Sequence, residues 1–137
     1  MNNWLMKSEP EAWSWDDQVK AGTAEWDGVR NHQAANFMKE MRLDDRVLFY
    51  HSGKERRIVG LCAVARTYYP DPTDESGRFG MVDVTALKPA PTPVTLAAIK
   101  ADPRLSDLYL VRQSRLSVMP ISSAHWRILT AMAGLDG

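Results

Sequence analysis

Two runs of the sequence constrain the fold more than any other feature: RVLFYH at residues 46–51 and RIVGLCAVA at residues 57–65. Both are rich in β-branched and aromatic residues, as β-strands are. Neither alternates apolar with polar residues, so we expect both faces of each strand to be covered. A small closed or nearly closed β-barrel flanked by helices meets this requirement. The two runs therefore predict an α+β fold of that kind.

Other segments complete this picture. Further strands are predicted at residues 4–7 (WLMK) and 81–88 (MVDVTALK), which makes four or five strands in all. Polar or proline-rich stretches at residues 68–78 and 89–93 are typical of loops, and both are too short to link two domains. A chain of 137 residues with 45% hydrophobic content suffices for one well-buried core. We expect a single domain over residues 1–137.

Four helices are predicted, each after a side chain that can accept a backbone N–H: Ser14, Asn31, Thr95 and Ser122. Ser14 and Asp17 have the spacing of a capping box. After Asn31, apolar residues recur at i, i+3, i+4 and i+7 and form one stripe: Ala34, Phe37, Met38 and Met41. These patterns predict short helices that pack on the barrel.

Charge is balanced overall but segregated along the chain. Lys plus Arg equals Asp plus Glu at 17 each, so a nucleic-acid or membrane partner must be met by a local patch. Residues 1–28 carry six acidic residues against two basic ones, whereas residues 104–127 carry four arginines against one aspartate. We expect Lys7, Arg30, Arg112 and Arg115 to converge on one positive face.

Several patterns exclude classes of protein. Cys62 is the single cysteine and cannot form an internal disulfide, which fits a reducing cytoplasm. The N-terminus has no basic, apolar and cleavable signal pattern, and no apolar run reaches the length of a membrane span. His32, His51 and His125 lack the spacing of a metal site. We expect a soluble cytoplasmic monomer without metal, cofactor or membrane partner.

A small barrel is filled by its own side chains, so a ligand site must lie at its rim. Polar residues follow predicted strands at KSEP (residues 7–10) and YHSGKERR (residues 50–57). WDGVRN, residues 26–31, adds a turn at Gly28 and a helix start at Asn31. These three segments are the candidate rim.

Motifs along the whole chain resemble the EVE domain family, which belongs to the PUA-like superfamily together with the YTH readers of methylated adenine. The motifs are WLMKSEP, WDGVRNHQAANFM, DRVLFYHSG, IVG with YPDPT, and SRLSVMPIS with Trp126. They extend from Asn3 to Leu129 in the family's order and spacing. The resemblance implies a PUA-like, mixed and mostly antiparallel small barrel flanked by short helices. It also implies a pocket for a single, modified base of DNA or RNA.

Base capture requires flat groups on the two π-faces and hydrogen-bonding groups around the edge. The stacking candidates are Trp13, Trp26 and Arg30, the last at a position where the related YTH readers carry a cage tryptophan. Candidates for the base edge are Lys7, Ser8, Asn31, His51 and Ser52. Candidates for the adjoining phosphate or sugar are Arg112, Ser114 and Arg115.

Plainer roles compete with these. Trp4, Trp15 and Trp126 are expected in the core, while Trp13 and Trp26 suit the core and the pocket equally. Glu9 is as well suited to an ion pair with Lys7 or Arg30 as to a ligand contact, and Arg115 is equally suited to a structural role.

Three classes of function follow. The favoured one is a non-catalytic reader of a modified base. A hydrolase of modified nucleosides is the second, because Lys7, Ser8 and Glu9 offer a base, a nucleophile and a proton carrier. Neighbouring strand residues point to opposite faces, however, which separates Ser8 from the other two and weakens this interpretation. A protein-interaction module is the third, and it would require an exposed apolar patch.

Overall fold

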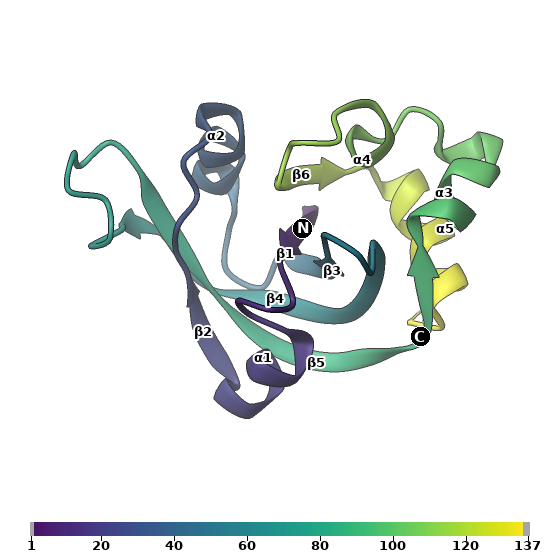
Figure 1. The fold of residues 1–137 in the computed structure, drawn as a ribbon, viewed down its shortest axis with the longest axis horizontal. Coiled ribbons are helices and arrows are strands. Elements are labelled where there is room, and N and C mark those ends of the chain that lie inside the picture. The colour runs from purple at the N-terminus through teal and green to yellow at the C-terminus, as the bar shows by residue number, and fades with distance from the viewer. Residues whose placement is uncertain (1, 136–137) are drawn as a thin grey trace.

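The computed structural model describes residues 2–135, and its six strands form one mixed sheet (Figure 1). The strands are β1 (Asn3–Ser8), β2 (Thr23–Trp26), β3 (Arg46–His51), β4 (Arg57–Pro70), β5 (Gly80–Thr95) and β6 (Val118–Ile121). The helices are α1 (Trp15–Ala21), α2 (His32–Glu40), α3 (Leu96–Ala101), α4 (Tyr109–Arg112) and α5 (Ser123–Ala133), with a 3₁₀ turn, η1 (Pro103–Leu105).

The sheet curls into an incompletely closed barrel. Its strand order is β2-β5-β4-β3-β1-β6. Only β1 and β3 are parallel, and the other neighbours are antiparallel. Register shifts interrupt the pairing of β4 with β5, and such bulges bend and twist a sheet. The expected mixed, mostly antiparallel fold flanked by short helices is confirmed.

The two runs that predicted the barrel are buried on both faces, as expected. Every residue from Val47 to His51 is buried, and so is every residue from Ile58 to Val64. Phe49 lies between Trp15 and Trp26, each in edge-to-face geometry with ring centroids 5.4 Å away. Phe49, near the end of β3, therefore packs against the start of α1 at Trp15 and the end of β2 at Trp26.

The other apolar predictions fit the same core. Trp4 and Cys62 are buried, and the indole N–H of Trp4 donates to Asp45 at 2.9 Å. Trp126 is half-buried and packs against the core.

All four predicted helix starts are confirmed. Ser14 and Asp17 form the capping box, in which the Ser14 hydroxyl accepts the Asp17 N–H at 3.1 Å. The side chains of Asn31, Thr95 and Ser122 accept N–H groups of Ala34, Ala98 and His125. The last helix ends at Gly134, which adopts the left-handed conformation that favours glycine.

Three predictions about loops and strands were wrong. Residues 89–93 are part of β5, because after an irregular stretch that strand pairs with β4 again at Val94 and Thr95, opposite Ile58 and Arg57. Its prolines lie beside register shifts, where ladder hydrogen bonds are interrupted. Similarly, β4 continues through Tyr68 to Pro70, so the loop begins later than expected. The short strands β2 and β6 escaped prediction and raise the total from four or five to six.

Candidate functional site

A cavity of about 740 Å³ opens at the rim, between the end of β1 and the edge strand β2. The edge strands of the sheet are β2 and β6, so the cavity borders one open edge of the sheet, that of β2. Its lining residues are Lys7, Ser8, Glu9, Ala12, Trp13, Thr23, Ala24, Glu25, Trp26, Asp27, Gly28 and Asp83. The structure thus brings four of the predicted pocket residues together: Lys7, Ser8, Trp13 and Trp26.

The polar end of β1 supplies one wall. The Lys7 ammonium donates to the Ser114 carbonyl at 2.8 Å and lies 5.8 Å from the centre of the Tyr50 ring. Partial burial lowers the pKa of Lys7 below its ordinary value. The Ser8 hydroxyl donates to the Trp13 carbonyl. One of the three N–H donors of the Lys7 ammonium is therefore engaged by Ser114, and two remain for a ligand.

Trp13 supplies a fixed flat surface. Its side chain is half-buried, and its indole N–H donates to the Gln18 side chain at 2.9 Å. Gln18 is fully buried and in turn donates to the carbonyls of Gly22 and Val84. The indole orientation is thus set before any ligand arrives.

Trp26 has a different position. It is only 8% exposed and packs edge-on against Phe49, so most of its ring belongs to the core. Of the two tryptophans that suited core and pocket equally, Trp26 therefore lies mainly in the core and Trp13 does not. Trp13 presents a partly open ring, whereas Trp26 contributes an edge of the cavity wall.

Carboxylates are the feature of the cavity that sequence reasoning missed. Glu25, Asp27 and Asp83 line it together with Glu9, against the single ammonium of Lys7. The acidic bias of residues 1–28 signalled the first two, but Asp83 arrives from β5. Carboxylate oxygens accept hydrogen bonds from amino groups such as N4 of cytosine. The cavity is therefore richer in acceptors than predicted.

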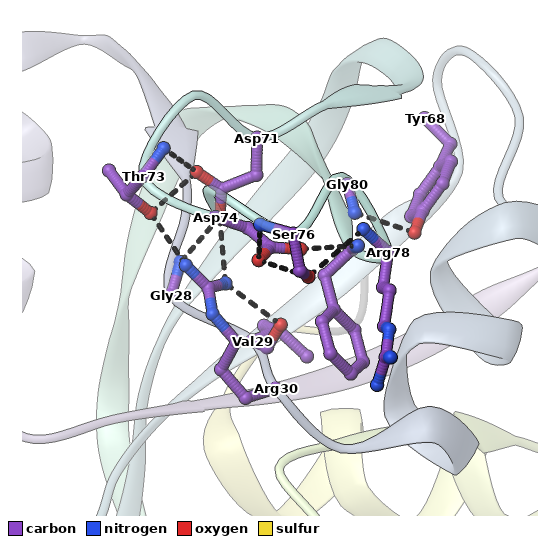
Figure 2. Close-up of polar contacts among 11 residues, drawn as sticks. Gly28, Val29, Arg30, Tyr68, Asp71, Thr73, Asp74, Ser76, Arg78 and Gly80 are labelled. Carbon is purple, nitrogen blue, oxygen red and sulfur yellow. Dashed lines mark hydrogen bonds and ion pairs between the residues drawn. The ribbon is translucent and has the colours of Figure 1, made fainter.

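Arg30 and Asn31 do not line the cavity. The Arg30 guanidinium pairs with Asp71 at 3.1 Å and donates to Thr73 at 2.8 Å, in the loop between β4 and β5 (Figure 2). The Asn31 side chain accepts the Ala34 N–H and so caps α2.

His51 and Ser52 are not among the residues that line the cavity. His51 Nε2 accepts the Trp15 N–H at 2.9 Å, so the ring proton is on Nδ1, 3.0 Å from Glu55. The hydrogen bond from His51, with a contribution from Arg57, lowers the pKa of Glu55. Ser52 donates through its N–H to the Ser8 carbonyl at 2.9 Å. His51 thus binds the start of α1, and Ser52 binds the end of β1.

Arg112, Ser114 and Arg115 are exposed, Arg112 as the last residue of α4 and the other two on the segment that follows it. The bond from Lys7 to the Ser114 carbonyl places this segment beside the cavity. Within residues 2–135, Glu9 forms no ion pair with Lys7 or Arg30, and its carboxylate instead lies 3.4 Å from the Ser52 hydroxyl. Arg30 is paired with Asp71, so its charge is not freely available to the expected positive face.

Two further properties are relevant to partners. In the described part of the chain, no group of three His, Cys, Asp or Glu side chains could hold a metal ion. None of the described helices is long and apolar enough to cross a membrane.

The mixed barrel and its rim cavity define the class of protein: an α+β domain of the EVE and PUA-like type. The chain belongs to the EVE domain family, whose model matches residues 2–132.

Solved structures and curated proteins agree with this assignment. An NMR structure of a protein from Rhodopseudomonas palustris is 50% identical, with a TM-score of 0.93, and the match covers 100% of this chain and 96% of that chain. The human THYN1 protein, solved in complex with DNA containing 5-methylcytosine, is 30% identical with a TM-score of 0.91 and complete coverage of both chains (100%). Mouse thymocyte nuclear protein 1 is 32% identical over 166 residues, which cover 96% of this chain and 73% of the relative.

Proposed function

We propose that this chain binds a single modified base of DNA in the cavity between β1 and β2, and that it recognises the base without reacting with it. The observation that most supports the proposal is the similarity over the whole chain to human THYN1, whose solved complex contains 5-methylcytosine DNA. The cavity supplies an independent physical argument, because it combines a fixed aromatic surface with polar groups around it.

Trp13 is the stacking surface in this proposal. A base that leaves the helical stack loses its neighbours and must recover that energy on an aromatic ring. The Gln18 contact at 2.9 Å fixes the Trp13 ring, so less conformational freedom is lost when a base binds. An apolar substituent such as the 5-methyl group adds contact area against the same surface.

The base edge meets groups of both kinds. Lys7 provides donors, and the carboxylates of Glu25, Asp27 and Asp83 provide acceptors. Cytosine presents an amino group at N4 and a carbonyl acceptor at O2, which match such a mixed lining. The same carboxylates repel phosphates, so the polynucleotide backbone is expected on the other side, along Arg112, Ser114 and Arg115.

Recognition without chemistry fits the hydrogen bonds of the site. A nucleophilic serine needs a base within reach of its hydroxyl proton. The Ser8 hydroxyl instead donates to the Trp13 carbonyl, and Lys7 donates to the Ser114 carbonyl. The runner-up, hydrolysis of a modified nucleoside, draws support from the lowered pKa of Lys7, because desolvation makes an amine a better candidate base.

A binding panel tests the proposal. Short DNA and RNA strands that carry one modified base, such as 5-methylcytosine or N6-methyladenine, are titrated against their unmodified counterparts by fluorescence anisotropy. We expect tighter binding to a modified DNA strand than to its counterpart. Equal affinity across the panel would reject the proposal. Tighter binding to the modified RNA strands would show that the polymer is RNA and not DNA. Mass spectrometry of the recovered nucleosides separates the runner-up, since turnover lost in Ser8→Ala or Lys7→Met would identify a hydrolase.

A further inference from the structure

Asp71 connects the loop after β4 to the wall of the cavity. It is 3% exposed, and its Oδ2 atom accepts both the Gly28 N–H at 2.9 Å and Arg30 Nη1 at 3.1 Å (Figure 2). Its Oδ1 atom accepts the N–H and the hydroxyl of Thr73 at 2.8 and 2.6 Å. A buried carboxylate with four donors is well compensated, so this connection is stable.

The Gly28 backbone depends on that connection. Gly28 lines the cavity and adopts a φ of +79°, a conformation that favours glycine. Its N–H is directed to Asp71 rather than to a strand partner. The turn that ends β2 is therefore held by a side chain from 43 residues further along the chain.

Arg30 is committed to the same cluster. Nη1 donates to Asp71 and to the Val29 carbonyl, and Nη2 donates to Thr73 at 2.8 Å. The guanidinium carbon lies 5.8 Å from the centre of the Phe79 ring. The side chain is 39% exposed, but it is not among the residues that line the cavity. Arg30 thus contacts Asp71, which contacts the wall.

We infer that Arg30 and Asp71 form a positioning pair: they fix the Trp26–Gly28 wall of the cavity, and Arg30 affects base recognition through Asp71 rather than by stacking on the base or contacting phosphate. The inference rests on the proposed function, because it assigns a role within the same site. It replaces the expected stacking role of Arg30 with an indirect one.

The competing explanation makes a different prediction. An arginine that binds phosphate releases counterions, so its removal lowers the dependence of affinity on salt. A positioning arginine leaves that dependence unchanged. The two roles also differ in coupling, because residues that act through one cluster show non-additive effects when both are changed.

The test compares Arg30→Met, Asp71→Ala and the double variant in binding to a DNA strand with one 5-methylcytosine. Asp74→Ala is the matched control, since Asp74 makes its contacts with Ser76 and Phe79 inside the same loop. Affinity is expressed per folded molecule and measured at several salt concentrations. Amide hydrogen exchange of Gly28 is measured by NMR in the free proteins.

We expect each single variant to weaken binding by about tenfold, the double variant to be no weaker than Asp71→Ala, and the slope of affinity against salt to stay unchanged. Gly28 exchange should accelerate in Asp71→Ala and not in Asp74→Ala. A smaller slope in Arg30→Met alone, additive losses, or unchanged Gly28 exchange in Asp71→Ala would overturn the inference. Equal affinity of the parent protein for methylated and unmethylated strands would instead reject the proposed function.

Discussion

Two tryptophans that border the same cavity differ in what they contribute. The Trp13 ring is half-buried and fixed by Gln18, whereas Trp26 is 8% exposed and packs on Phe49. Removal of the Trp13 ring should therefore mainly lower affinity, and removal of the Trp26 ring should mainly lower stability.

Trp13→Ala should weaken binding of the modified strand by roughly 1–3 kcal/mol, the scale of base stacking on an aromatic ring. Trp13→Phe should retain most of the affinity, because a flat surface remains. Trp26→Ala serves as the contrast and should lower the free energy of unfolding by about 3–5 kcal/mol. Titrations and chemical denaturation measure the two quantities. An equal loss of stability in both alanine variants, with affinity per folded molecule unchanged, would place Trp13 in the core.

In the proposed function, Lys7 should make recognition dependent on pH. Burial lowers its pKa from the ordinary value of 10.5, so its ammonium loses its proton at a lower pH than an exposed lysine does. Between the lowered pKa and 10.5, Lys7 is protonated in the unfolded chain but has lost its proton in the folded one. The free energy of unfolding should therefore rise with pH in this window. Affinity should fall in the same window, as a donor and a charge disappear. Binding and unfolding titrations at alkaline pH test both trends, and Lys7→Met should show neither.

At the scale of elements, the loop between β4 and β5 is fastened by Asp71. Burial acts to raise the pKa of this carboxyl, but hydrogen bonds from Thr73, Gly28 and Arg30 outweigh it and lower the pKa to about 2. A depressed pKa stabilises the fold above the unfolded value of 3.8, and that stabilisation is lost as the pH falls toward about 2.

Acid unfolding measures this contribution. The parent protein should lose stability between a pH of about 4 and about 2, and Asp71→Ala should lose less over that interval because it lacks the group. Pro72→Ala controls for general weakening of the loop, since it changes the same loop without removing a titratable group. Parallel acid profiles for the parent and Asp71→Ala would show that Asp71 is not held by these donors.

Local patterns predicted most elements of this fold, and contacts between distant segments account for what they missed. The caps at Ser14, Asn31, Thr95 and Ser122 are local, so the sequence reveals them. The four-residue strands β2 and β6 are too short to show a period, and they form because longer neighbours pair with them. The prolines of β5 are typical of a loop, but pairing with β4 on both sides of them keeps this segment within the strand.

The site follows this rule too. Lys7, Ser8 and Trp13 come from one short stretch and were predicted together, whereas Asp83 and Asp71 arrive through the pairing of β5 and the loop before it. Arg30 looked free for stacking because its partner Asp71 is 41 residues away. No periodic pattern encodes such a contact.

At the scale of the whole molecule, charge is sorted around the cavity although the net charge is zero. Glu25 on β2 and Asp83 on β5 lie on one side, whereas Lys7, with Glu9 two residues further along the chain, adjoins the segment with Arg112 and Arg115 on the other. In the proposed function, this arrangement would orient a polyanion instead of attracting it from every direction.

Arg112→Ala and Arg115→Ala should therefore each reduce the slope of log affinity against log salt concentration by roughly 0.7–0.9, the value expected for one lost phosphate contact. Both should leave the preference for the modified base intact, because phosphate contacts carry no base information. Arg127→Ala, on α5, is the matched control. An unchanged slope in both variants would remove the proposed backbone path.

The central claim is that the cavity between β1 and β2 reads the modified base, and NMR titration tests it most directly. Amide and indole resonances of the ¹⁵N-labelled protein are followed while a DNA strand with one 5-methylcytosine, or the same strand with cytosine, is added. We predict that the methylated strand shifts Lys7, Ser8, Gly28 and the Trp13 indole at concentrations where the unmethylated strand leaves them unmoved. Shifts confined to other surfaces, or identical shifts with both strands, would contradict the claim.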